Sequence, residues 1–121
     1  KTGSSQVYLY IFDKHPEYEE NSPYEDFGTP HGVDVQYVFM NMDRNNQYLN
    51  DSDIEMSNII GEYWTNFAKT GNPNSSNLPN WDKFSVENQK ALNLGSEIKM
   101  IEVPDASSME VLSEYYDWRR R

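Results

Sequence analysis

Two histidines are the side chains whose titration range suits proton transfer at neutral pH, and their surroundings differ. His31 lies in the run DFGTPHGVDVQYVF, between Gly28 and Gly32 and directly after Pro30. Glycine permits backbone conformations that are closed to other residues, and proline stiffens the approach to the imidazole. An imidazole held on such a loop can take and return a proton, so His31 is a candidate general acid–base residue.

Two plainer interpretations of His31 stay open at this point. Its ring could cap a helix or strand through a backbone hydrogen bond, or it could be one ligand of a metal ion. Metal sites in proteins usually take three or four ligands, and this chain has two histidines and no cysteine. We therefore expect no metal and no cofactor. His15, in DKHPEY, has the features of an exposed loop residue without a catalytic role.

The elements around His31 follow from the pattern of apolar residues. Residues 6–13, QVYLYIFD, are apolar on both faces, which predicts a long central strand whose neighbours come from elsewhere. Residues 14–30 form a loop above the usual length, and loops of that kind are often functional. Alternation in residues 33–39, VDVQYVF, favours a short strand over a helical turn.

Residues 50–73 predict the clearest helix of the chain. Ser52 and Glu55 fit a capping box at its start, while Gly71 and Pro73 end it. We interpret its apolar stripe as a core-facing surface and not as a cofactor site. The stripe recurs at three- and four-residue spacing through Ile54, Met56, Ile59, Ile60, Tyr63, Trp64 and Phe67.

The last third of the chain predicts a hairpin and a helix. Trp81 and Phe84 are expected to anchor a turn-rich connection, and residues 90–103 predict two short strands around Gly95 and Ser96. Residues 107–120 predict a terminal helix. The side chains expected to point inward from that helix are Met109, Leu112, Tyr115 and Tyr116.

Composition narrows the classes of partner. Twenty acidic residues against ten basic ones give a net charge of −10, which argues against nucleic acid or anionic membrane as a partner. There is no apolar run long enough to predict a membrane span, and without cysteine there is no disulfide framework. Aromatic residues make up 14% of the chain, so we expect a folded piece that completes a larger core.

Two N-x-S sequons, at Asn50 and Asn74, are glycosylation acceptors if the protein is secreted. Such matches also arise by chance in a chain rich in asparagine. They leave the compartment open, with a secreted or extracytoplasmic location slightly favoured.

Several motifs together resemble one family. VYLYIFD, GTPHGVDVQYVF, EYWTNFAKTGNPN, LPNWDKF and ALNLG occur in the order seen near the C-terminus of type-B carboxylesterases and cholinesterase-like proteins. The resemblance covers most of residues 6–95. It implies an α/β fold: residues 1–121 would be the C-terminal segment of a single α/β-hydrolase catalytic domain, completed by a missing N-terminal part and not independent of it.

The resemblance also implies a function. The chain would belong to a carboxylic ester hydrolase with a Ser-Asp/Glu-His triad, in which His31 matches the general-base histidine by position. The chain contains no G-x-S-x-G motif. The serine and the acid would therefore come from an N-terminal chain or segment of the same esterase, and this segment alone would be inactive. The alternative is a catalytically inactive, cholinesterase-like binding or adhesion protein.

Residues next to His31 are candidates for contact with a small-molecule ester. Thr29, Pro30 and Val33 would line the acyl or alcohol pocket, or they would serve as scaffold for the loop.

Overall fold

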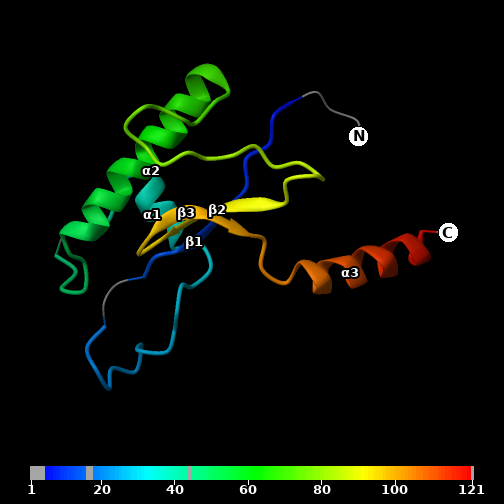
Figure 1. Ribbon diagram of the computed structural model, residues 1–121. Helices are drawn as coiled ribbons and strands as arrows, with labels where there is room; N and C mark the ends of the chain where they lie inside the picture. The colour runs from blue at the N-terminus through cyan, green and yellow to red at the C-terminus, as the bar shows by residue number, and fades with distance from the viewer. Residues whose placement is uncertain (1–4, 16–17, 44, 121) are drawn as a thin grey trace.

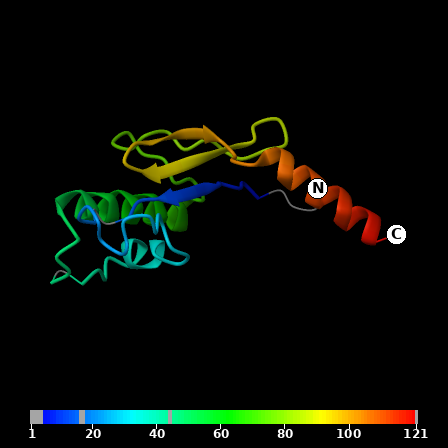
Figure 2. The same cartoon turned by 90° about the horizontal axis from the view of Figure 1, so that it is seen from below.

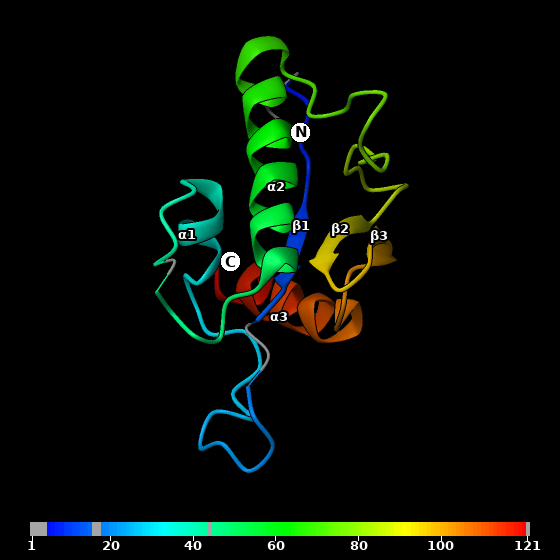
Figure 3. The ribbon, with the colours of Figure 1, turned by 90° about the vertical axis from the view of Figure 1, so that its left-hand side faces the viewer.

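The computed structural model describes residues 5–15, 18–43 and 45–120, which form a small mixed sheet with a long helix packed along it (Figure 1). A second, short helix lies beside the long one (Figure 3). In chain order the elements are β1 Tyr10–Asp13, α1 Asp34–Val38, α2 Asp51–Thr70, β2 Lys90–Gly95, β3 Ile98–Glu102 and α3 Ala106–Arg119.

The sheet has the order β1-β2-β3, with β1 parallel to β2 and β2 antiparallel to β3. The predicted hairpin is confirmed, but the predicted strand over residues 6–13 is wrong in length. Only four residues form β1, and β2 is the middle strand. The residues before β1 instead form a backbone hydrogen bond with the connection between α2 and β2. The Val7 carbonyl accepts this bond from the Phe84 N–H at 2.9 Å. Within this chain β2 therefore supplies one of the neighbours that β1 needs.

The predicted long helix is present as α2, but the residues that cap its start differ from those expected. Asn50 is the N-cap, its side chain accepts from the Ser52 N–H, and the Asp53 carboxylate accepts from the Asn50 N–H at 2.9 Å. The expected Ser52–Glu55 capping box is wrong because Ser52 already lies in the first turn. Gly71 ends the helix with a φ of 74°, as its position predicted.

One face of α2 packs on the sheet and contributes three of the buried core residues (Figure 3). Met56, Ile60 and Tyr63 are buried against β2 and the connection that follows α2. The remaining buried members of this core are Tyr37, Trp81, Leu92 and Leu94. In the described part of the chain, no helix is both long and apolar enough to cross a membrane.

Residues 34–38 form the helix α1, so the strand favoured by alternation is wrong. Alternation would place Val35 and Phe39 on the buried face with Tyr37, yet both are at least half exposed. The apolar contacts follow helical spacing instead, because Val33, Tyr37 and Val38 pack against the core. Because Tyr37 would be buried in either structure, the exposure of Val35 and Phe39 is what distinguishes the helix from the strand.

The terminal helix α3 is present but does not pack inward (Figures 1 and 2). Both views show it extending away from the sheet. The prediction of an inward face is wrong, because the side chains that were to form it are about half or more exposed: Met109, Leu112, Tyr115 and Tyr116. The apolar residues of this helix are therefore left exposed in the described structure.

Candidate active site

His31 lies on an exposed turn immediately before α1, at the end of the long loop that follows β1. Gly28 and Gly32 have φ angles of 57° and 78°, in the region that favours glycine. The Val33 N–H donates to the Pro30 carbonyl at 3.3 Å and closes the turn around the histidine. The prediction that the two glycines give this loop a special backbone is confirmed.

The residues next to His31 differ in exposure. Thr29 is half-buried, and its Oγ1 is buried without a hydrogen-bond partner among the described residues. Pro30 is exposed, whereas Val33 is half-buried and packs against the core. Their role in lining a substrate pocket stays a prediction.

Neither histidine is buried, but their environments differ. The His31 side chain is exposed, and no described residue forms a hydrogen bond or ion pair with its ring. His15 is half-buried and interacts with its surroundings, so the expectation of an exposed loop residue is wrong. It directly follows Lys14, whose ammonium lies near a buried carboxylate.

That carboxylate belongs to Asp53, which is fully buried in the first turn of α2. Its Oδ1 accepts a hydrogen bond from Tyr37 Oη at 2.8 Å and lies 3.5 Å from Lys14 Nζ. The same ammonium donates to Ser52 Oγ at 2.8 Å. We call Lys14, Tyr37 and Asp53 the carboxylate clamp. It joins the end of β1, α1 and α2.

Two further hydrogen bonds hold α1. Ser57 Oγ donates to the Tyr37 carbonyl at 2.6 Å, which ties α1 to the middle of α2. Tyr10 Oη donates to Asp34 Oδ2 at 2.8 Å, which ties the first residue of α1 to β1. The helix that follows His31 is therefore bonded to the body at both of its ends.

These contacts change the acidity of the tyrosines. Burial, reinforced by the hydrogen bond to the Asp34 carboxylate, raises the pKa of Tyr10 to about 12. Burial and the bond to Asp53 raise the pKa of Tyr37 well above its usual range. Both hydroxyls consequently stay protonated and act as hydrogen-bond donors at any physiological pH.

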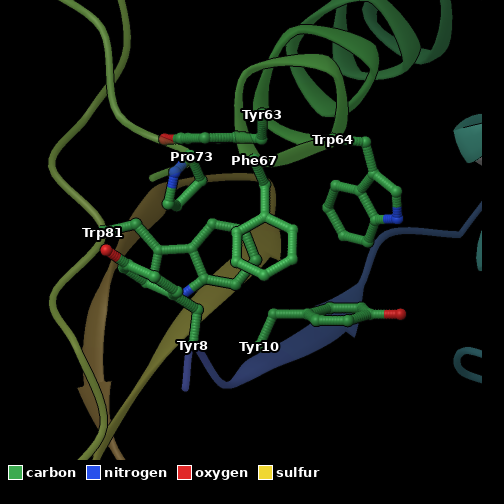
Figure 4. Close-up of a pocket in the computed structure, with 7 residues that line it drawn as sticks. All are labelled: Tyr8, Tyr10, Tyr63, Trp64, Phe67, Pro73 and Trp81. Atoms are coloured by element: carbon green, nitrogen blue, oxygen red, sulfur yellow. The ribbon is translucent and has the colours of Figure 1, made fainter. Parts of the chain in front are cut away.

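A separate aromatic cavity of about 190 Å³ lies between α2 and the chain around β1 (Figure 4). Figure 4 shows Tyr63, Trp64 and Phe67 reaching it from α2. Trp81, on the connection after α2, and the tyrosines beside β1 close the other sides. Its lining residues are Tyr8, Tyr10, Tyr63, Trp64, Phe67, Pro73 and Trp81. The interpretation of the α2 stripe as a packing face is confirmed for Tyr63, but Phe67 is 46% exposed.

The two sequons occupy different structures. The exposed Asn50 uses its Oδ1 for capping. The Nδ2 of Asn74, the atom that would carry a sugar, donates to Asn72 Oδ1 and to the Trp81 carbonyl, each at 3.0 Å. A sugar would leave Nδ2 only one N–H, so modification of Asn74 would break one of these bonds.

Sequence reasoning did not find the carboxylate clamp. Asp53 stands at the third position after the N-cap of α2, where acidic residues are common. The bond between its carboxylate and the Asn50 N–H could therefore be predicted from the sequence. The approach of Lys14 and Tyr37 to the same carboxylate is a tertiary contact, and no spacing in the sequence indicates it.

Comparison with known proteins identifies the relatives of this chain. A sequence model described as "Carboxylesterase family" matches residues 1–112. Para-nitrobenzyl esterase of Bacillus subtilis (strain 168) is 32% identical over 110 residues, which are 88% of this chain and 21% of that relative. Human cocaine esterase is 32% identical over 84 residues, 69% of this chain and 15% of the relative.

The structural comparison agrees. A solved structure of PNB esterase superposes with a TM-score of 0.71 at 31% identity, over 87% of this chain and 21% of that one. This supports the predicted α/β class, with the strand lengths and helix exposures corrected as described above. The chain spans about a fifth of the length of these relatives, or less. It belongs to the carboxylesterase family of type-B carboxylesterases and cholinesterase-like proteins.

Proposed function

We propose that this chain supplies the catalytic histidine of a serine carboxylesterase, and that this residue is His31. The observation that carries the proposal is the turn itself. His31 is exposed between two glycines with positive φ, on a loop whose following helix is bonded to the body. Such a setting presents an imidazole to a reacting group while fixing the direction from which it approaches.

The rest of the triad would come from the companion part of the esterase. The chain has no G-x-S-x-G motif, and its relatives are about four times as long. The nucleophilic serine and its acidic partner would lie in an N-terminal chain or segment that packs against this one. The His31 ring forms no polar contact within the described structure, so both of its nitrogens can serve these partners.

The chemistry follows from the two ring nitrogens. One takes the proton of the serine hydroxyl as the serine oxygen attacks the ester carbonyl carbon. The other donates to the triad carboxylate, which fixes the tautomer. The imidazolium then protonates the departing alcohol as the ester C–O bond breaks. Finally, the neutral ring activates a water molecule that releases the acid and regenerates the serine.

The proposal is tested by replacing His31 with alanine in the complete esterase and measuring turnover of a p-nitrophenyl ester. We expect kcat to fall by about 10,000-fold or more, as when other triad histidines are lost. The matched control is His15→Ala, which removes the other imidazole and should keep kcat within about threefold of the parent. If the His31→Ala enzyme keeps kcat within tenfold of the parent, the proposal is wrong.

The same pair of variants separates the enzyme from the inactive binding protein considered above. An adhesion protein of this fold would show no ester turnover in the parent, and neither histidine variant would change the result. Saturable turnover that requires His31 supports the esterase.

A further inference from the structure

Two side chains, one at each end of the loop that carries His31, meet the same buried carboxylate. Lys14 lies directly after β1, where the loop begins. Tyr37 lies in α1, the helix that directly follows the histidine turn. Lys14 Nζ and Tyr37 Oη approach Asp53 Oδ1 to 3.5 Å and 2.8 Å. Asp53 is therefore in contact with side chains at both ends of this loop.

We propose that Asp53 is a positioning residue for His31, and that the carboxylate clamp sets where the imidazole stands relative to the triad serine. This inference rests on the proposed catalytic role of His31. It adds that a residue of α2, which touches neither substrate nor the reacting atoms, governs the rate through Lys14 and Tyr37.

The clamp is rigid because each of its polar side-chain groups already has a partner in the interior. Asp53 is fully buried, and its second oxygen, Oδ2, accepts from the Asn50 N–H at 2.9 Å. The carboxylate therefore cannot rotate without losing the cap of α2. The Lys14 side chain is only 11% exposed, and its ammonium is also held by Ser52. Breaking a buried ion pair of this kind leaves an uncompensated charge, so an intact clamp resists opening.

The clamp reaches His31 through a short and stiff path. The Tyr37 ring is fully buried, and its carbonyl is bonded to Ser57, so α1 cannot slide along α2. At the other end of α1, Asp34 is bonded to Tyr10. The turn that bears His31 joins α1 directly. A shift of α1 would therefore move the imidazole, and a displacement of about 1 Å can cost up to a hundredfold in rate.

The inference is tested by comparing two Tyr→Phe variants of the complete esterase. Tyr37→Phe removes the hydroxyl that joins α1 to Asp53. Tyr63→Phe removes a hydroxyl that is donated to the Pro79 carbonyl at 2.6 Å, from an equally buried ring on α2. Each variant loses one hydrogen bond of the interior, but only the bond lost in Tyr37→Phe belongs to the clamp. Turnover of a p-nitrophenyl ester is measured well below the melting temperature of each variant.

We expect Tyr37→Phe to lower kcat by roughly ten- to a hundredfold while KM stays within about twofold. Tyr63→Phe should leave kcat within about twofold of the parent. Lys14→Met, which releases the other end of the loop, should lower kcat like Tyr37→Phe. Its matched control is Lys69→Met, on the exposed last turn of α2, which should leave kcat unchanged.

The outcomes separate this inference from the proposed function. If His31→Ala is inactive but Tyr37→Phe and Tyr63→Phe have the same kcat, the clamp does not position His31 and the inference is overturned. The same holds if the two variants melt lower by the same amount and lose activity equally, since that is a general loss of stability. If His31→Ala itself stays active, the proposed function fails, and the inference with it.

Discussion

At the scale of single residues, three tyrosine hydroxyls are held by strong acceptors in or near the interior. Tyr10 donates to Asp34, Tyr37 to Asp53 and Tyr63 to the Pro79 carbonyl, at distances of 2.6–2.8 Å. Burial is the main cause of the raised pKa of each, which reaches about 12 for Tyr10 and Tyr63. These phenols lose a proton far less readily in the folded state than in the unfolded chain.

This difference predicts how stability depends on pH. The unfolded chain releases the phenolic protons near pH 10, whereas the folded protein keeps them up to about pH 12 for Tyr10 and Tyr63. Stabilisation from the raised pKa values is therefore complete below pH 10 and is lost as the pH rises from 10 towards 12. Urea unfolding of the complete protein across this range should show a falling free energy, and Tyr63→Phe should make the fall less steep.

A direct check is the absorbance of tyrosinate in native protein, compared between the parent and each Tyr→Phe variant. The difference spectrum should report a tyrosine that stays protonated at pH 10. A difference spectrum with its midpoint at pH 10, together with unfolding free energies that do not change between pH 10 and 12, would contradict the prediction.

At the scale of elements, the Trp81 indole anchors the irregular connection between α2 and β2 to the sheet. Trp81 is 5% exposed, and its Nε1 donates to the Leu9 carbonyl at 2.9 Å. Its backbone N–H donates to Asn74 Oδ1. Its ring meets four others edge-on or tilted, with centroids 5.3–6.1 Å away: Tyr8, Tyr10, Tyr63 and Trp64.

Trp81→Ala should therefore lower the free energy of unfolding of the complete protein by about 3–5 kcal/mol, because it opens a cavity and leaves the Leu9 carbonyl with one donor fewer. Val86→Ala is the control, since that side chain is 71% exposed on the same connection. It should cost about 0.5 kcal/mol or less. Chemical denaturation of both variants checks this. Equal costs would mean that the connection is not anchored by Trp81.

The elements that the sequence predicts well are those whose signals are local. The helix α2 carries an apolar stripe and a terminal glycine, and the hairpin is marked by Gly95 and Ser96. The sequence predicts a strand where the helix α1 forms, because five residues satisfy both periods and only the exposure of Val35 and Phe39 distinguishes them. The face of α3 could not be predicted, because an apolar pattern does not say whether a partner is present.

The same division applies to the candidate site. The turn around His31 was predictable from Gly28, Pro30 and Gly32, because these residues constrain their own backbone. The carboxylate clamp was not, since Lys14 and Asp53 come together only through the packing of α2 on β1. Local chemistry thus indicates which residue can react, while tertiary packing decides which residues hold it in place.

At the scale of the whole molecule, the chain exposes more surface than a compact protein of its mass. Its accessible surface is 9122 Å², whereas a folded monomer of 14.2 kDa exposes about 6,800 Å². The exposed apolar residues concentrate on two elements. One is α3, with Met109 and Trp118 among others, and the second is the α1 region, with Phe39 and Met40. Both regions are suited to burial against a companion part of an esterase.

We therefore predict that residues 1–121 expressed alone are unfolded or insoluble, and that they become soluble when produced together with the companion part. The buried core of the described structure contains few large side chains for its length, and this limits its stability. Thermal unfolding of the isolated segment, followed by circular dichroism, should show no cooperative transition. A sharp, reversible transition would contradict the prediction.

The catalytic role of His31 can be measured as the acylation burst of the complete esterase, in a stopped-flow experiment with a p-nitrophenyl ester. We expect a rapid burst of p-nitrophenol in the parent and in His15→Ala, and none in His31→Ala. Added imidazole should restore part of the turnover of His31→Ala, because a free ring replaces the missing base. A burst in His31→Ala with a rate constant within tenfold of the parent would contradict the assignment of His31.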